Sequence, residues 1–241
     1  CRSIGRGVNI MEVCGTHTVS IFRNGIRSLL PENLKMLTGP GCPVCVTDQG
    51  YIDSIIELAE REDTILATYG DMLRVPGSNG SLENTSRQNN VRIVLSAEDA
   101  LQLAAENPQN TVVFAAVGFE TTAPSTAVVT KEALAMDLKN FCILSNHKLV
   151  IPAMDTLLSG RNDKIDAFLC PGHVSAITGY GIFDQIAEEY SVPCVTAGFT
   201  PEQILSGLLE ICRQLQRGKP HSANVYHAAV TREGNPAAKQ I

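Results

Sequence analysis

The sequence predicts an α/β protein of two tandem domains. Each domain is built on a roughly four-stranded, mainly parallel sheet covered by helices, with a cleft between the domains. Three observations support this class: short apolar runs recur at similar intervals, segments of helical periodicity separate them, and polar, glycine-rich clusters follow them. Continuous apolar strands that alternate with helices are typical of parallel sheets buried on both faces.

The strands are predicted from eight apolar, often β-branched runs. In chain order they cover residues 8–13, 34–37, 64–68, 91–95, 112–117, 141–144, 167–170 and 194–197. Eight strands could also form one sheet or close into a barrel, but we favour two sheets divided at the turn-rich segment 107–110. This places the first domain at residues 1–107 and the second at 108–218, with 219–241 as a linker toward a C-terminal portion that the chain lacks.

The helices are predicted from apolar residues at helical spacing and from their start signals. Ile52, Ile55 and Ile56 mark one apolar face. Segments 96–99 and 200–203 read as capping boxes, the second with proline at the first helical position.

Composition excludes several classes of protein. The chain has 241 residues, of which 44% are hydrophobic and 18% charged, and its net charge of −6 argues against a nucleic-acid partner. No run approaches the about 18 apolar residues that span a bilayer, and no signal peptide is evident. We therefore expect a cytoplasmic protein without a membrane partner, whose eight cysteines are mostly reduced. Cys142, Cys170, Cys194 and Cys212 lie in or beside apolar runs and are expected to be buried, inert thiols.

Polar clusters follow most of the predicted strands. They lie at residues 14–18, 42–45, 69–78, 118–124, 145–148 and 171–175. Because open parallel sheets bind ligands at the carboxyl ends of their strands, loops from both domains are expected to line the cleft.

The CPVC turn at residues 42–45 permits three interpretations. Cys42 and Cys45 could exchange electrons as a dithiol/disulfide pair, because that chemistry needs two close sulfurs. Together with Cys14 and His17 they could instead complete a zinc site. They could also be two small residues in a tight turn.

Cys14 follows the first predicted strand, three residues before His17. A thiol at a strand end and helix start is well placed to be a metal ligand, and a nearby imidazole can accept its proton or orient a ligand. Because both cysteine segments follow strands of one sheet, we expect Cys14, Cys42 and Cys45 to meet at one sheet edge.

Other polar residues allow a functional or a structural interpretation. His147 and His173 could be ligand-facing or could simply cap helices, and Asp71, Arg74 and Glu120 could act as acid, base or anion-binding groups. The segment 121–125 offers backbone N–H groups to an anion, although capping explains it equally well. The chain contains no P-loop, GxGxxG or GxSxG motif, so nucleotide hydrolysis and serine hydrolase chemistry are disfavoured.

Five of these segments resemble a known motif series. They read MEVCGTHT at 11–18, GPGCPVCV at 39–46, YGDMLRVPGS at 69–78, GFETTAP at 118–124 and PGHVS at 171–175. In this order they resemble HypD, the NiFe-hydrogenase maturation (hydrogenase formation) factor family, from about residue 8 to residue 236.

The resemblance implies a scaffold on which the Fe(CN)2CO unit of the hydrogenase is assembled, together with a small HypC-like chaperone and a HypE-like cyanide donor. Cys14 would hold the iron together with a HypC cysteine, His17 would lie beside it, and Cys42 and Cys45 would be the redox pair. In the second half, Gly118, Glu120, Thr121, Thr122 and His173 would line the cleft opposite.

The family pattern also includes a 4Fe-4S cluster bound by four C-terminal cysteines, from which this chain departs. No cysteine follows Cys212, so we expect this chain to lack the cluster. It is expected to be a scaffold with thiol redox capability rather than an ordinary turnover enzyme. The alternatives are a stand-alone thiol–disulfide oxidoreductase that uses CPVC and a zinc-stabilised binding module.

Overall fold

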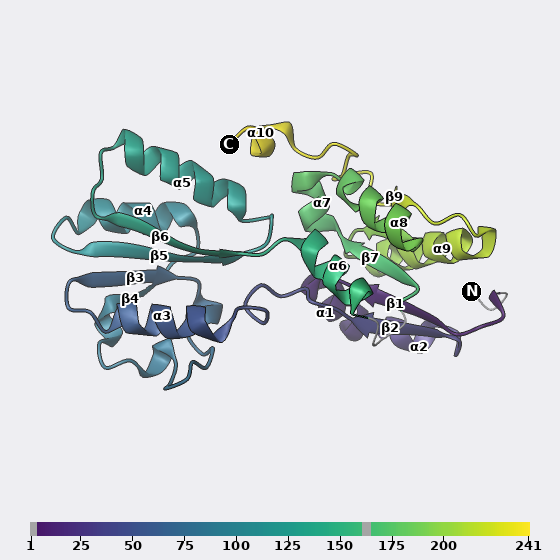
Figure 1. Cartoon of the computed structure of the whole chain (residues 1–241), viewed down its shortest axis with the longest axis horizontal. Helices are drawn as coiled ribbons and strands as arrows, with labels where there is room; N and C mark the ends of the chain where they lie inside the picture. The colour runs from purple at the N-terminus through teal and green to yellow at the C-terminus, as the bar shows by residue number, and fades with distance from the viewer. Residues whose placement is uncertain (1–3, 161–164) are drawn as a thin grey trace. The chain divides into compact units, whose positions relative to one another are not determined.

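A computed structural model describes residues 4–160 and 165–241 and confirms the predicted α/β class with two parallel sheets. The chain divides into two compact units (Figure 1). The first unit combines Cys1–Cys42 with Leu149–Gln240, and the second is Pro43–Lys148 with the last residue. This division differs from the predicted boundary at 107–110. The strands on either side of that boundary, 64–68 and 111–118, pair in parallel within one sheet, so they belong to one unit.

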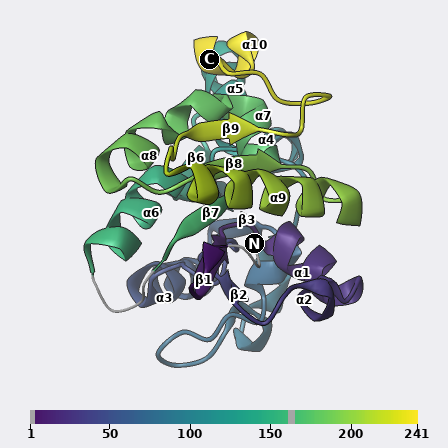
Figure 2. The ribbon, with the colours of Figure 1, turned by 90° about the vertical axis from the view of Figure 1, so that its right-hand side faces the viewer.

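The first unit has a five-stranded parallel sheet in the order β2-β1-β7-β8-β9. Its strands are β1 (Val8–Glu12), β2 (Leu34–Thr38), β7 (Ala167–Pro171), β8 (Cys194–Ala197) and β9 (Ser222–Asn224). Its α-helices are α1 (Gly15–Arg23), α2 (Ile26–Leu29), α6 (Val150–Ser159), α7 (Gly172–Thr178), α8 (Asp184–Tyr190), α9 (Pro201–Arg217) and α10 (Pro236–Gln240), and Tyr180–Phe183 forms a 3-10 helix. In Figure 2, α1, α2 and α9 lie on one side of this sheet and α6 and α8 on the other.

The second unit has a four-stranded parallel sheet in the order β4-β3-β5-β6. Its strands are β3 (Thr64–Thr68), β4 (Val91–Ile93), β5 (Thr111–Gly118) and β6 (Phe141–His147). Its α-helices are α3 (Gln49–Ala59), α4 (Ala97–Glu106) and α5 (Ala123–Ala135), and short 3-10 helices occur at Gly70–Met72, Leu82–Asn84 and Gln88–Asn90.

The apolar runs that form the inner strands β1, β3, β5, β7 and β8 are buried on both faces of the sheets. On β5, Val112 and Phe114 pack into one core with α4 and α5, whereas Val113 and Ala115 pack into another with α3. Successive side chains of a strand point to opposite faces, so a strand covered on both sides needs a continuous apolar run.

Both predicted capping boxes are present. Ser96 accepts from the N–H of Asp99 at the start of α4, and Thr200 accepts from Gln203 at the start of α9. In each pair the downstream side chain accepts from the N-cap backbone N–H in return, so these helices begin where the sequence predicts.

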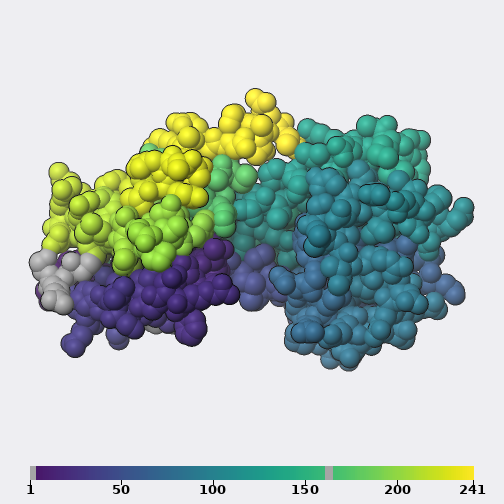
Figure 3. Space-filling view, turned by 180° about the vertical axis from the view of Figure 1, so that it is seen from behind, coloured from purple at the N-terminus to yellow at the C-terminus, as the bar shows by residue number. Residues whose placement is uncertain are grey.

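The predicted linker at 219–241 is wrong in part, because its beginning folds into the first unit. Ser222–Asn224 forms β9, which pairs with β8. The following residues run over the outer surface of this unit, as the yellow chain on green in Figure 3 shows. Arg232 pairs with Asp184 there, and the N–H of Asn235 donates to the carbonyl of Ile177.

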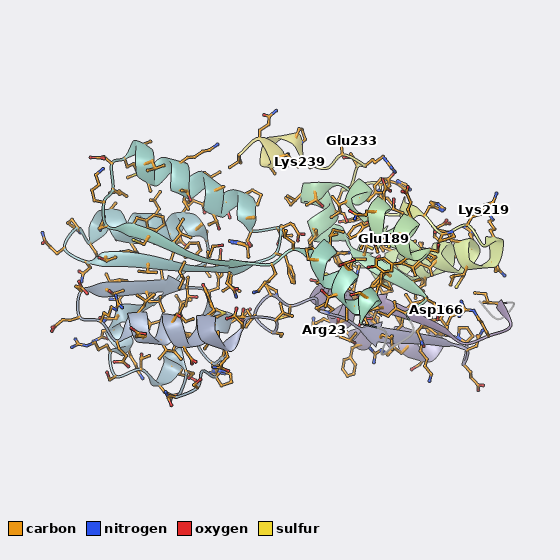
Figure 4. All side chains as sticks on the ribbon, in the orientation of Figure 1. Arg23, Asp166, Glu189, Lys219, Glu233 and Lys239 are labelled. Atoms are coloured by element: carbon orange, nitrogen blue, oxygen red, sulfur yellow. The ribbon has the colours of Figure 1, made fainter. Side chains whose placement is uncertain are left out.

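The N-terminal part of the first unit is joined to β7 by an ion pair. Asp166, labelled in Figure 4, accepts from Arg6 at 2.6 Å and from the N–H of Asn9 at 2.8 Å. None of the helices in the described ranges is long and apolar enough to cross a membrane.

Candidate functional site

Each sheet has a point where the chain order reverses. In the first unit β1 and β7 are neighbours, but the chain continues from β1 to β2 on one side and from β7 to β8 on the other. Open parallel sheets bind ligands beyond the strand ends at such a point. Cys14 follows β1 and His173 follows β7, so both predicted site residues come from the strands that flank the reversal.

Cys14 is the N-cap residue of α1. Its backbone is extended, with φ −152° and ψ 121°, and its side chain makes no capping hydrogen bond. The residue is buried, with 8% exposure. Unsatisfied N–H groups and the helix dipole favour negative charge at this end of a helix, which is a suitable environment for a thiolate.

The backbone that leads to Cys42 lies directly against the Cys14 segment. The N–H of Gly39 donates to the carbonyl of Glu12 at 2.8 Å. The N–H of Gly15 donates to the carbonyl of Gly41 at 3.1 Å. A Cβ atom on Gly41 would lie 2.4 Å from the nitrogen of Gly15, so only glycine fits this approach. The chain therefore crosses the start of α1 at Gly41, the residue before Cys42.

His17 lies in the first turn of α1 and is fully buried. Its Nε2 atom lies 3.0 Å from the carbonyl oxygen of Gly198. A carbonyl only accepts, so Nε2 carries the proton and Nδ1 the lone pair. Burial lowers the pKa of His17 to about 4, so the ring is neutral at pH 7. Nδ1 is buried and has no hydrogen-bond partner among the described residues.

The loop after β8 brings an aromatic cluster to the same place. The ring of Phe199 lies 4.9 Å from that of His17 and stacks on His173 with ring centroids 4.0 Å apart. Tyr226, which follows β9, meets Phe199 edge-on at 6.2 Å. His173 itself is exposed, and partial burial lowers its pKa.

Glu12 is the last residue of β1 and is fully buried. One carboxyl oxygen accepts from Thr38 at 2.9 Å and from Thr18 at 3.3 Å, and Arg27 lies 3.9 Å away. The other oxygen is buried and has no partner in the described part of the chain. Burial raises the pKa of Glu12, because it penalises the charged form more than these contacts favour it.

In the second unit, β3 and β5 flank the corresponding reversal. A Cβ atom on Gly118, at the end of β5, would lie 1.7 Å from Oγ1 of Thr122 and 3.2 Å from Cδ2 of His147. Thr121 is exposed and Glu120 is half-buried. Ser145 Oγ lies 2.9 Å from Nδ1 of His147, whose Nε2 is buried and unpartnered within the described ranges.

His147 lines a mainly apolar pocket of about 510 Å3 between α5 and β6. Burial lowers the pKa of His147, as expected for an imidazole that lines an apolar pocket.

Comparison with known proteins agrees with these motifs. The profile of the HypD family, described as the hydrogenase formation hypA family, matches residues 2–241. The hydrogenase maturation factor HypD of Escherichia coli is 44% identical over 236 residues, which cover 98% of this chain and 63% of the relative. The chain belongs to the HypD family.

Other HypD relatives have similar coverage. HypD of Cupriavidus necator is 42% identical over 98% of this chain and 65% of its own length. A putative hydrogenase expression/formation protein of Methanocaldococcus jannaschii is 44% identical over 97% of this chain and 65% of its own. The chain thus spans just under two thirds of the length of these curated relatives.

The CPVC turn of this HypD-family chain continues into α3. The N–H of Thr47 donates to the carbonyl of Val44 at 3.2 Å, and its hydroxyl donates to the carbonyl of Pro43 at 2.9 Å. Asp48 then caps α3 by accepting from the N–H of Tyr51. Cys42 is half-buried and Cys45 is exposed.

No set of side chains for a resident metal ion is found in the described ranges. No group of three or more His, Cys, Asp or Glu residues there is arranged to hold a metal. The described residues therefore give no support to the zinc site of Cys14, His17, Cys42 and Cys45. A metal unit held by a single thiolate of this chain requires no such group.

The remaining cysteines follow the prediction only in part. Cys170 and Cys194 are buried neighbours, as expected, and burial raises the pKa of the Cys170 thiol. Cys142 is exposed because it lies on β6, the edge strand of its sheet. Cys212 is buried as predicted but takes part in a disulfide.

Sequence reasoning missed Glu12, Gly198, Phe199 and Tyr226. Glu12 gives a signal of its own, because a carboxylate inside an apolar strand needs a reason. Gly198 and Phe199 follow a predicted strand just as the recognised motifs do, and this position could have identified them.

Proposed function

We propose that this chain serves hydrogenase maturation as an assembly scaffold that holds the Fe(CN)2CO unit, its cargo, through the Cys14 thiolate. The observation that carries the proposal is the backbone hydrogen bond from Gly15, which follows Cys14, to Gly41, which precedes Cys42. Membership of the HypD family and the names of the relatives support the same role.

The surroundings of Cys14 suit a thiolate that holds low-spin iron. Soft thiolate ligands match an iron that carries cyanide and CO. The start of α1 favours negative charge on the sulfur. Cys14 is largely shielded from water, so a bound unit is protected on the protein side. The neutral His17 is a weak base, so its proposed role is to orient the unit through the Nδ1 lone pair, which is unused among the described residues.

We propose that Cys42 and Cys45 are the redox-active pair of the scaffold. When two thiols close to a disulfide they release two electrons and two protons. The pair is held in a turn closed by Thr47, and Cys45 is exposed to a partner that could restore the thiols. His173, Glu120, Gly118, Thr121 and Thr122 remain proposed contacts for the cargo or for the proteins that deliver it.

The partners are proposed from the family. A HypC-like chaperone would supply the second cysteine ligand to iron, and a HypE-like protein would deliver cyanide.

Infrared spectroscopy tests this function. The chain is purified anaerobically with its HypC-like partner, and cyanide and CO stretches are expected from the bound unit. Cys14→Ala should abolish them, while Cys142→Ser, which changes an exposed cysteine in the other unit, should leave them intact. Bands that persist in Cys14→Ala would refute the assignment of Cys14.

The same preparations distinguish the oxidoreductase alternative. A stand-alone oxidoreductase reduces generic disulfide substrates at a rate that depends on Cys42 and Cys45 but not on Cys14. The scaffold predicts negligible turnover of such substrates by the chain.

A further inference from the structure

The loop after β8 connects three elements of the first unit. The carbonyl of Phe199 accepts from the hydroxyl of Ser20 on α1 at 2.7 Å. Its N–H donates to the side chain of Gln203, which also closes the capping box of α9. Its ring stacks on His173 at the start of α7. Phe199 is therefore fixed from both its backbone and its ring.

The same loop determines the state of His17. The carbonyl of Gly198 holds the Nε2 proton, which leaves the lone pair on Nδ1. The ring of Phe199 lies against the imidazole, tilted by 37° at 4.9 Å, so it limits the rotation that would exchange the two nitrogens. A buried, unpartnered acceptor is costly to maintain, which favours a role that uses it.

The close packing around the loop leaves little room for another arrangement. A Cβ atom on Gly198 would lie 2.1 Å from the side-chain oxygen of Gln203, and one on Gly172 would lie 2.6 Å from the carbonyl of Ala197. Tyr226 closes the edge of Phe199. The close packing at Gly198 and Gly172 thus restricts the loop that carries the Phe199 ring.

We propose that Phe199 is a positioning residue that holds the imidazoles of His17 and His173 together, so that His17 presents its Nδ1 lone pair within the first turn of α1 and His173 stands at the surface beside it. The pair then offers one buried acceptor and one exposed imidazole at the strand ends that flank the reversal of the sheet. The role of this arrangement of imidazoles in cargo assembly rests on the proposed function, but the arrangement itself does not.

Nuclear magnetic resonance of the metal-free protein, with nitrogen-15 in histidine, tests the arrangement. In the wild type His17 should give a single tautomer, protonated on Nε2, whose proton exchanges slowly with water. Phe199→Leu removes the aromatic ring and should produce a mixture of tautomers, with exchange of this proton faster by about tenfold, the effect of losing one well-held hydrogen bond. Phe199→Tyr keeps the ring and should restore the single tautomer.

Matched variants exclude general loosening. Phe183→Leu changes a fully buried phenylalanine elsewhere in the same unit and should leave the His17 signal unchanged. Phe199→Met is a second non-aromatic variant for the case in which Phe199→Leu fails to fold. A folded Phe199→Leu or Phe199→Met protein with the wild-type tautomer and exchange rate overturns the proposal. A Phe183→Leu protein that shows the same mixture of His17 tautomers as Phe199→Leu also overturns the proposal.

A second measurement separates this inference from the proposed function. In the presence of the HypC-like partner, Phe199→Leu should weaken the cyanide and CO bands, whereas Phe199→Tyr should retain them. If Cys14 does not hold iron, these bands do not depend on Phe199, and the imidazole result stands by itself. If the bands depend on Cys14 but Phe199→Leu keeps them at full strength, the positioning role in assembly is overturned.

Discussion

The N–H of Gly15 donates a hydrogen bond to the carbonyl oxygen of Gly41 at 3.1 Å. The two glycines stand next to Cys14 and Cys42, so this bond joins the backbones of the two cysteine segments. It also explains why glycine occupies position 41, where any side chain would collide with the backbone of residues 14 and 15.

Gly41→Ala should destabilise the protein and separate the two cysteine segments. The new Cβ atom would lie 2.4 Å from the nitrogen of Gly15, and overpacking of this kind costs about 1–3 kcal/mol of unfolding free energy. Denaturant unfolding measures the loss, and faster maleimide labelling of Cys14 reports the opening. Gly7→Ala is the control, because no atom lies within 4 Å of its added Cβ. Equal stability of the two variants would contradict the close approach.

His17 should make the protein sensitive to acid between pH 6.5 and pH 4. Burial lowers its pKa from 6.5 to about 4, so the unfolded chain binds the proton more tightly than the native protein. The contribution of neutral His17 to the unfolding free energy is fully present above pH 6.5, and the unfolding free energy falls by up to about 3 kcal/mol as the pH drops through this window. Unfolding at several pH values measures it. His17→Gln should remove this dependence of the unfolding free energy on pH, whereas His227→Gln, at an exposed histidine, should keep it. An unchanged pH dependence in His17→Gln would refute the assignment of the acid sensitivity to His17.

Glu12→Gln should be at least as stable as the wild type at pH 7. Burial raises the pKa of Glu12 above 4.5, so the native protein holds this proton more tightly and loses stability as the pH rises through the raised value. The glutamine side chain does not ionise, so the variant should not lose stability in this way as the pH rises. Its amide oxygen can still accept from Thr18 and Thr38. Unfolding at pH 4 to 8 measures the effect, with exposed Glu32→Gln as the control. A loss of more than about 1 kcal/mol at pH 7 would instead indicate a charged carboxylate stabilised by Arg27.

Gly118→Ala should destabilise the second unit through Thr122. The added Cβ would overlap Oγ1 of Thr122, at 1.7 Å, so we expect a cost of about 1–3 kcal/mol. Thr122→Ala removes that oxygen, and the double variant should therefore be more stable than the sum of the single effects predicts. Strict additivity would show that the two residues do not collide.

The fold could be predicted as far as local patterns determine it. Each of the eight apolar runs overlaps an observed strand, and both capping boxes start helices. β9 was missed because Ser222–Asn224 is short and only partly apolar. The domain boundary was misplaced because strand order is a tertiary property: β7 joins β1 although the whole second unit lies between them in the chain.

The candidate site was predicted from motifs and missed where it depends on contacts across the fold. The segments of Cys14 and Cys42 each carry a recognisable residue pattern. Phe199 does not, because its importance comes from the rings of His17 and His173, which lie far away in sequence. The free oxygen of Glu12 likewise depends on packing that no local pattern encodes.

We propose that the sulfur of Cys14 binds the iron of the cargo. The most direct measurement replaces Cys14 by selenocysteine and records selenium X-ray absorption of the complex with the HypC-like partner. A selenium–iron distance slightly longer than the about 2.3 Å of metal–thiolate bonds is the predicted result. Selenium without an iron neighbour, in a sample whose infrared bands show that the unit is bound, would contradict the account.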